Sequence, residues 1–288
     1  MRGPRRMLAR KMWNYAGLAV LVTLAGLAVA PLLHILYLVA LKGGEAIARI
    51  GLRRFLTESP HPFDPSDPGG IGPALLGTLE LAALTAAGAT LIALPAAVLI
   101  SELRGSRLSR ATLLLALTLV EFPTILVGLT VYAVLVDHLV GRYNMLAGAA
   151  ALAIVVLPYL VVQASEALRQ VPEGVREAAY SMGAPRTTTV YALIAPAARR
   201  GILVGLLIGL ARAAGETAPL LFTIGGAYEG YHLCLLREGG AVPLMIYQFI
   251  QMPYQAAREL AWGAALVLML IVVTVMVAAR LIVREVRM

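Results

Sequence analysis

Two ionisable residues stand four positions apart inside an apolar stretch of the sequence. Arg212 and Glu216 lie in the run ARAAGETAPLL, and on a helix this spacing puts both side chains on one face, one turn apart. An ionised group inside a membrane is costly and usually faces a cavity or a partner. Two interpretations stay open: a salt bridge that ties a span into its bundle, or a guanidinium that binds an oxyanion in transit while the carboxylate holds it between turnovers.

Other residues around apolar stretches bear on the same chemistry. Gly215 and Pro219 beside the pair are expected to loosen the helix and to expose backbone groups to a wet cavity. Glu121 lies next to Pro123, and a pathway role and a helix-pairing role are equally supported. Glu80 is interpreted as a side chain that reaches the lipid headgroups. The predicted substrate-pathway residues are Arg212, Glu216 and Glu121.

The stretches that carry these residues are long enough to cross a bilayer. Of the 288 residues, 60% are hydrophobic and 14% are charged, against about 25% charged in soluble domains. A span needs roughly 20 apolar residues. The sequence therefore predicts an all-α integral membrane protein with six transmembrane helices, and residues 242–251 as a short interfacial or partly re-entrant helix. The predicted spans are 16–41, 71–100, 111–136, 145–162, 201–224 and 260–283.

Basic residues are unevenly distributed between the predicted loops. With the N-terminus inside, 16 Lys and Arg lie in cytoplasmic segments and seven lie outside, which predicts a multi-pass protein of the cytoplasmic (inner) membrane with both termini in the cytoplasm. The net charge of +8 is thus an orientation signal, and no nucleic-acid partner is predicted. One cysteine and four histidines give neither a disulfide framework nor metal-ligand spacing.

Residues 171–185, VPEGVREAAYSMGAP, carry the signals of one short isolated helix. Pro172 suits the first helical position, Gly183 can cap the end and Pro185 forbids continuation. So short a helix does not hold in water unaided, so its apolar stripe needs a partner. The membrane surface or the chain's own bundle is as well supported as a groove on another protein. The stripe consists of Val175, Ala178, Ala179 and Met182, with Glu173, Arg176, Glu177 and Ser181 on other faces.

The same segment resembles the EAA loop of ABC importer permeases. Glu177-Ala178-Ala179 is followed after three residues by Gly183 and after nine more by Leu193-Ile194-Ala195-Pro196, and the family pattern is EAA, three residues, Gly, nine residues, Ile-x-Leu-Pro. Ala195 stands where the family has Leu. The resemblance implies a coupling helix seated in a groove of a cytoplasmic ATPase subunit. The coupling residues it implies are Val175, Glu177, Ala178, Ala179, Met182 and Gly183.

A second segment, residues 211–222, resembles a smaller group within this family. ARAAGETAPLLF, residues 211–222, resembles the fifth-span signature of phosphate ABC importer permeases, and its ETAPLL ending is similar to the PstA-type subunit. The resemblance implies a type I ABC importer permease fold. Its core domain would cover residues 69–288, with five transmembrane helices and the EAA loop, after an N-terminal basic segment, first span and external loop in residues 1–68. Further agreeing stretches begin at Gly70, Phe122, Glu166 and Val242.

The resemblance also implies an import complex. Its members would be a second, PstC-type permease, a dimer of PstB-type ATP-binding subunits, an extracytoplasmic PstS-type phosphate-binding protein, phosphate and the lipid bilayer. The sequence has no G-x-x-x-x-G-K-[ST] loop, so ATP binding by that mechanism is excluded. We therefore expect a chain that is not an enzyme and carries no cofactor, with ATP and Mg used by the partner ATPase.

Two other functions remain open at this point. One is a permease for another oxyanion, such as molybdate, tungstate or sulfate, because recognition by arginine would not separate these anions. The other is a stand-alone, proton-coupled secondary transporter with Glu80, Glu121 and Glu216 as proton carriers. A membrane-embedded enzyme is disfavoured because the sequence offers no set of nucleophile, base and orienting residue.

Overall fold

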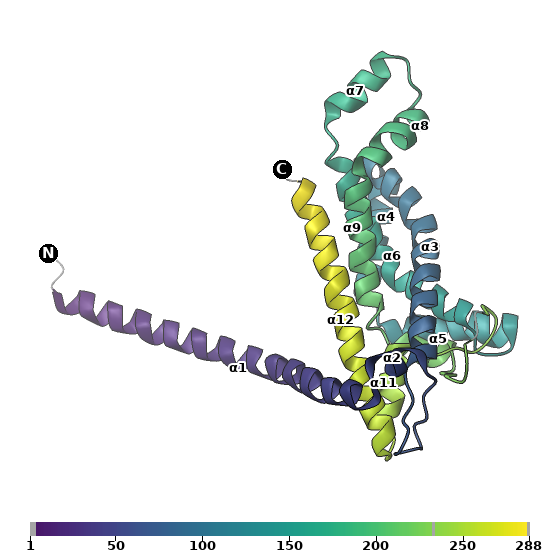
Figure 1. Cartoon of the computed structure of the whole chain (residues 1–288). Coiled ribbons are helices and arrows are strands. Elements are labelled where there is room, and N and C mark those ends of the chain that lie inside the picture. Colours follow the sequence, from purple (N-terminus) through teal and green to yellow (C-terminus); the bar gives the residue numbers. More distant parts are fainter. Residues whose placement is uncertain (1–3, 232–233, 287–288) are drawn as a thin grey trace.

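The protein is a bundle of long helices from which one helix projects (Figure 1). The structure is a computed structural model that describes residues 4–231 and 234–286. Residues 1–3, part of the predicted N-terminal basic segment, lie outside the described residues. The described chain is helical without β-strands, and five of its helices are long and apolar enough to cross a membrane. The longest helices are α1 (Pro4–Ile50), α3 (Gly72–Glu102), α6 (Met145–Arg169), α9 (Ala195–Ala213) and α12 (Gln255–Val286).

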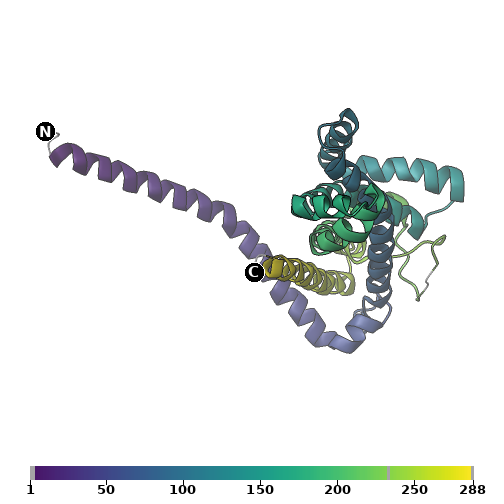
Figure 2. The same cartoon turned by 90° about the horizontal axis from the view of Figure 1, so that it is seen from above.

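Short helices lie at the two ends of this bundle. Figure 1 places α7 and α8 at one end, and α2 and α11 at the other. Figures 1 and 2 both show the N-terminal part of α1 extending away from the remaining helices. The short helices are α2 (Leu52–Thr57), α7 (Glu173–Ser181), α8 (Arg186–Thr188), α10 (Ala218–Thr223) and α11 (Val242–Ile250), with π-helical turns η1 (Tyr132–Val140) and η2 (Thr189–Ile194).

The third span differs from the predicted straight helix over 111–136. It consists of α4 (Arg107–Val120) and α5 (Thr124–Val131) with η1, and the two halves meet at 101°. Pro123 lacks a backbone N–H and disfavours helical geometry in the residue before it, so α4 ends just ahead of it.

The bent pair nevertheless carries the chain from one end of the bundle to the other. At the beginning of α4, Ser109 donates its hydroxyl to the carbonyl of Ile100 near the end of α3, at 3.3 Å. After η1, the backbone N–H of Asn144 donates to the carbonyl of Thr223 at the opposite end, at 2.8 Å. Counted as one span, the pair raises the number of spans from five to six, and the predicted count is confirmed.

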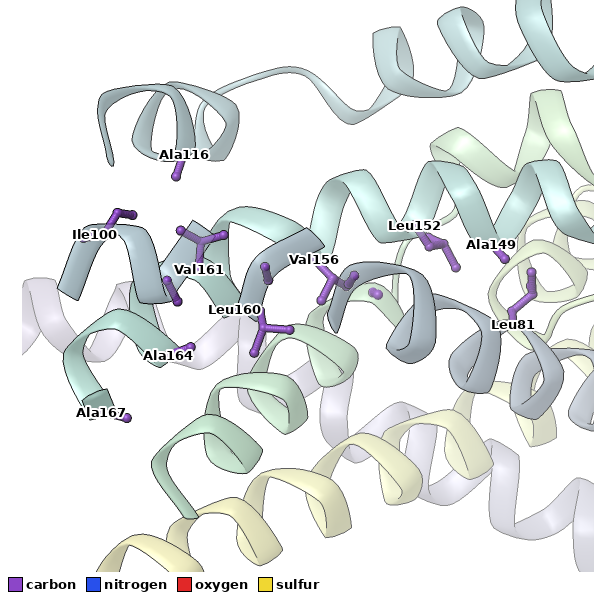
Figure 3. Close-up of a cluster of buried hydrophobic side chains, with 14 of the residues drawn as sticks. Leu81, Ile100, Ala116, Ala149, Leu152, Val156, Leu160, Val161, Ala164 and Ala167 are labelled. Atoms are coloured by element: carbon purple, nitrogen blue, oxygen red, sulfur yellow. The ribbon is translucent and has the colours of Figure 1, made fainter. Parts of the chain in front are cut away.

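The main core lies where α3 packs against α6 (Figure 3). Ala89, Ala93 and Ala97 form a buried stripe of small residues along α3. Small side chains let two helices approach closely, which provides van der Waals contact where the hydrophobic effect is weak. Leu152, Val156 and Leu160 of α6 belong to the same cluster, among the side chains labelled in Figure 3. A second cluster joins Phe55, α11 and the first turns of α12.

A glycine every fourth residue lets α9 pack closely on α6. A Cβ atom added at Gly201, Gly205 or Gly209 would lie 2.5 to 2.7 Å from a side-chain carbon of α6. This spacing is the small-xxx-small pattern of tightly packed membrane helices. The packing fixes the position of α9, whose last turn carries Arg212.

Gly205→Ala is expected to destabilise the bundle by about 1 to 3 kcal/mol, because the new methyl group would lie 2.6 Å from Cβ of Gln163 and overpacking has costs of this size. The thermal unfolding midpoint of the purified complex is the measurement. Gly17→Ala is the matched control, because a Cβ at Gly17 meets nothing within 4 Å and the change improves helix propensity. Equal midpoints in the two variants would contradict the packing argument.

The predicted short helix over 242–251 is confirmed as α11. It is packed into the bundle more deeply than an interfacial helix, since Val242, Leu244 and Met245 are buried. The backbone N–H of Val242 donates to Oγ1 of Thr78 on α3 at 2.9 Å, so the first turn of α11 is fastened to that helix.

Candidate functional site

Arg212 lies in the last turn before a break in the predicted fifth span, and Glu216 lies within that break. The expected single helix over 201–224 is wrong: α9 ends at Ala213 and α10 begins at Ala218. The expected loosening near Gly215 and Pro219 is confirmed by this break. The pair still meets there, with Nε of Arg212 3.9 Å from Oε1 of Glu216.

The geometry of this pair is that of a loose contact. Its 3.9 Å separation exceeds the hydrogen-bonding range of 2.7 to 3.2 Å. The side chain of Arg212 is 49% exposed and that of Glu216 is 17% exposed. Most hydrogen-bonding capacity of the guanidinium is therefore not used by Glu216, and the arrangement leaves its planar fork available to an anion.

Tyr159 of α6 completes the surroundings of Arg212, and sequence reasoning missed it. The guanidinium carbon of Arg212 lies over the Tyr159 ring, 4.9 Å from its centroid. A cation over an aromatic face is attracted to the ring and held in orientation. The only sequence signal is a tyrosine directly after Pro158 in an apolar span, which does not identify its partner.

A small apolar cavity lies beneath the helix break. Its volume is about 30 Å³, and Thr78, Leu81 and Thr85 of α3 line it together with Ala213 and Ala214. A much larger groove of about 910 Å³ lies at the other end of α6 and α9, beside the beginning of α7. The larger groove has charged residues in its wall, which are Glu166, Arg199 and Arg200.

Glu121, the third predicted pathway residue, and Glu80 have no hydrogen bond or ion pair with Arg212 or Glu216 in the described part of the chain. Glu121 is exposed at the bend between α4 and α5. Glu80 lies in α3, and its Oε2 is buried with no hydrogen-bond partner among the described residues. The residue as a whole is half-buried, and the interpretation that it reaches the headgroups stays a prediction.

The predicted short helix within residues 171–185 is confirmed as α7, with its start shifted by one residue. Pro172 stands just before the first helical residue. At the other end, Gly183 has φ +79°, and the N–H groups of Gly183 and Ala184 donate to the carbonyls of Tyr180 and Ala179. This is the Schellman ending, in which a glycine in the left-handed region satisfies the last carbonyls of a helix.

The apolar stripe of α7 does not face a single partner. Ala179 is 1% exposed and points into the bundle, whereas Met182 is 80% exposed. Val175 and Ala178 are also exposed, as is Glu177. Arg176, predicted on a different face from the stripe, is buried. The stripe is therefore divided: one alanine seats α7 on its own chain, and three apolar side chains remain uncovered.

Arg176 is held by two partners that the sequence pattern did not indicate. Its Nη2 donates to Oε1 of Glu102, the last residue of α3, and to the carbonyl of Leu168 on α6, each at 3.1 Å. The side chains of Arg176 and Glu102 are 5% and 8% exposed. The partners are 74 positions apart in the sequence, a separation that no local pattern encodes.

Residues 89–288 match the family described as "Binding-protein-dependent transport system inner membrane component", and the chain belongs to this family. Within it, the chain is 42% identical over 279 residues to the probable phosphate transport system permease protein PstA of Methanocaldococcus jannaschii, which covers 96% of this chain and 94% of the relative. It is 33% identical to PstA 1 of Mycobacterium tuberculosis, over 96% of this chain and 90% of that relative.

Solved structures agree on the fold. The MetNI methionine ABC transporter, in an inward-facing conformation, matches with a TM-score of 0.57 and 25% identity over 73% of this chain and 94% of the matched chain. An amino acid ABC transporter matches with a TM-score of 0.52 and 19% identity over 74% of this chain and 92% of that chain. The predicted type I importer permease fold and the resemblance to PstA-type permeases are thus confirmed.

Proposed function

We propose that this chain is the PstA-type permease subunit of an ATP-driven importer of inorganic phosphate. The observation that carries the proposal is the 42% identity to a PstA relative over 96% of the chain. A match over 96% of the chain includes most of the N-terminal 68 residues as well as the core domain. A stand-alone secondary transporter is disfavoured, because the chain belongs to a family whose members work with a binding protein.

In this proposal, Arg212 meets the anion at the helix break. The guanidinium is half exposed, lies over Tyr159 and is only loosely paired with Glu216. Such a group offers two parallel N–H donors to a phosphate edge. Glu216 holds the guanidinium when no anion is bound. Glu121 belongs to the third span's bend, where it lines the path at a distance from this pair.

The proposed complex follows from the parts that this chain lacks or leaves uncovered. Its sequence has no P-loop, so ATP and Mg act in a dimer of PstB-type subunits. The exposed side chains of α7 provide the surface that these subunits bind. A PstC-type permease would form the other half of the conduit, and a PstS-type phosphate-binding protein would deliver the anion from outside. The chain itself performs no bond chemistry.

Phosphate uptake tests this function directly. The purified complex, reconstituted in vesicles with internal ATP and the matching binding protein, is expected to accumulate labelled phosphate. Uptake should stop when ATP is omitted and continue when an uncoupler removes the proton gradient. Uptake of sulfate, molybdate or tungstate without phosphate would assign the chain to another oxyanion, and loss of uptake with the uncoupler alone would support a proton-coupled carrier.

The proposed orientation puts both termini in the cytoplasm. Reporters fused to either terminus are expected to be cytoplasmic, and reporters inserted at Asp67 or Arg237 are expected to be external, because 16 of the loop and tail cations lie on the proposed inner side and seven on the outer side. The measurement is the side of the membrane on which each reporter is active in whole cells. Termini on opposite sides of the membrane would contradict the six-span orientation.

A further inference from the structure

The last turn of α3 collects arginines from three successive elements of the chain. Arg169, the last residue of α6, donates to the carbonyl of Ile100 at 3.3 Å. Arg176 of α7 donates to the carboxylate of Glu102. Arg186 of α8 donates to the backbone carbonyl of Glu102 and has Nε 4.0 Å from its Oε2. We call Arg169, Arg176 and Arg186 on this turn the arginine cluster.

The C-terminal end of α3 explains why arginines gather there. The last carbonyls of a helix have no partners within it, and they form the negative end of the helix dipole. Guanidinium groups are suited to such an end because they donate several hydrogen bonds in fixed directions. The carboxylate of Glu102 adds a full negative charge, which is 8% exposed. The coupling loop is thereby fastened to α3 by polar contacts.

Apart from the arginine cluster, α7 packs mainly against η2, the turn that leads into α9. Among the residues of α7, only Arg176 and Ala179 are buried. Ala179 has a single methyl group, whereas Arg176 reaches both α3 and α6. Any displacement of α7 therefore acts on α3 mainly through the Arg176–Glu102 pair.

The other half of α3 reaches the proposed anion site. Its 31 residues span about 46 Å at a rise of 1.5 Å per residue. Thr78, Leu81 and Thr85 line the small cavity beneath the break that follows Arg212 and contains Glu216. One continuous helix, with Pro95 inside it, thus connects the cluster at one end with the broken span at the other (Figure 1).

We infer that Glu102 is the positioning residue through which movement of the coupling helix α7 reaches α3 and, by way of α3, the helix break at Arg212. This inference rests on the proposed function and deepens it. It requires α7 and the cytoplasmic end of α3 to move as one body. The carboxylate of Glu102 keeps them together because Arg176 is buried against it.

The experiment measures the distance between α7 and α3 in two nucleotide states. Spin labels are attached at Leu103→Cys and Ser181→Cys, both exposed positions, after the only native cysteine is removed by Cys234→Ser. The complete complex is studied without nucleotide and after trapping with ATP and vanadate. With Glu102 present, the mean distance is expected to be the same in both states. With Glu102→Gln, it is expected to differ between them.

A second readout is the number of ATP molecules hydrolysed per anion imported. Glu102→Gln is expected to raise this ratio at least about fivefold, the low end of coupling between distant sites, and Glu102→Asp should recover part of the loss. Arg104→Gln is the matched control, because Arg104 lines the same surface but donates to Ser101 in its own chain segment at 3.0 Å. Its ratio should equal that of the unsubstituted complex.

A failure of Glu102→Gln to assemble would call for the double variant Glu102→Leu with Arg176→Met. Apolar residues of similar size remove the buried charges without leaving one unpaired, so assembly is expected to return while the raised ratio remains. A native ratio in this variant, or a label distance that changes between states while Glu102 is present, would overturn the inference. The distances do not depend on which anion is carried, so a complex that fails to import phosphate would contradict the proposed function alone.

Discussion

Arg212→Gln is expected to give a complete, stable complex that imports phosphate roughly ten- to hundredfold more slowly, which corresponds to the loss of about 1.5 to 3 kcal/mol from a hydrogen bond to a charged group. Glutamine keeps most of the side chain but loses the charge and the fork of parallel donors. Lysine at this position should recover only part of the rate, because it retains the charge without the fork. The measurement is phosphate uptake per assembled complex in vesicles that contain ATP.

The controls separate anion binding from a structural ion pair. If Arg212 only tied the break together, removing Glu216 as well would restore the complex, since no unpaired charge would remain. We expect no such rescue from Glu216→Gln, because the two side chains are 3.9 Å apart and only loosely paired. Arg142→Gln, at an exposed loop position, should transport normally. Near-normal uptake by Arg212→Gln would rule out an essential anion contact.

Met182→Asp is expected to abolish association with the ATP-binding subunits while the permease still folds. Met182 is 80% exposed, so the change costs the isolated bundle little. Inside an apolar groove on a partner, an unpaired carboxylate would be strongly unfavourable. Co-purification of the ATPase with the tagged permease is the measurement, with phosphate uptake as a second readout. Retained association and uptake would contradict the assignment of this surface.

Ala179→Asp should fail in a different way, although both residues belong to the stripe predicted from the sequence. Ala179 is 1% exposed and faces its own bundle, so the new carboxylate would be buried without a partner. We expect a lower yield of folded permease and a lower unfolding midpoint, by about 1 to 3 kcal/mol of stability. Equal yields of the two variants would indicate that α7 turns its other face to the bundle.

Local patterns in the sequence predicted most of the helices. The positions of proline and glycine predicted the start of α7 to within one residue. The lengths of the apolar segments predicted the spans around α3, α6 and α12. The same method failed at Pro123 and at Ala214. At both places the chain remains apolar while the helix stops, because the cause is backbone geometry and packing against neighbouring helices. Hydropathy alone predicts neither the backbone geometry nor the packing.

The sequence predicted the two charged residues of the candidate site, but it did not predict the side chains that contact the arginines. Arg212 and Glu216 stand out because charges are rare in apolar segments. Tyr159 and Glu102 do not, because each owes its role to a contact with a side chain more than fifty positions away. Such contacts depend on how the helices pack, and a single sequence carries no direct signal for them.

The bend at Pro123 also decides on which side of the membrane each later helix begins, because the two halves around it count as one crossing. By length alone, α4 with 14 residues and α5 with η1, 17 residues together, would extend about 21 Å and 26 Å at 1.5 Å per residue, so neither half crosses a hydrocarbon core of about 30 Å. Insertion must therefore accept the two halves together. If they returned to the same face instead, every later helix would be inverted. The helix α7, which we propose couples the chain to a cytoplasmic ATPase, would then face the outside, where that ATPase could not bind it.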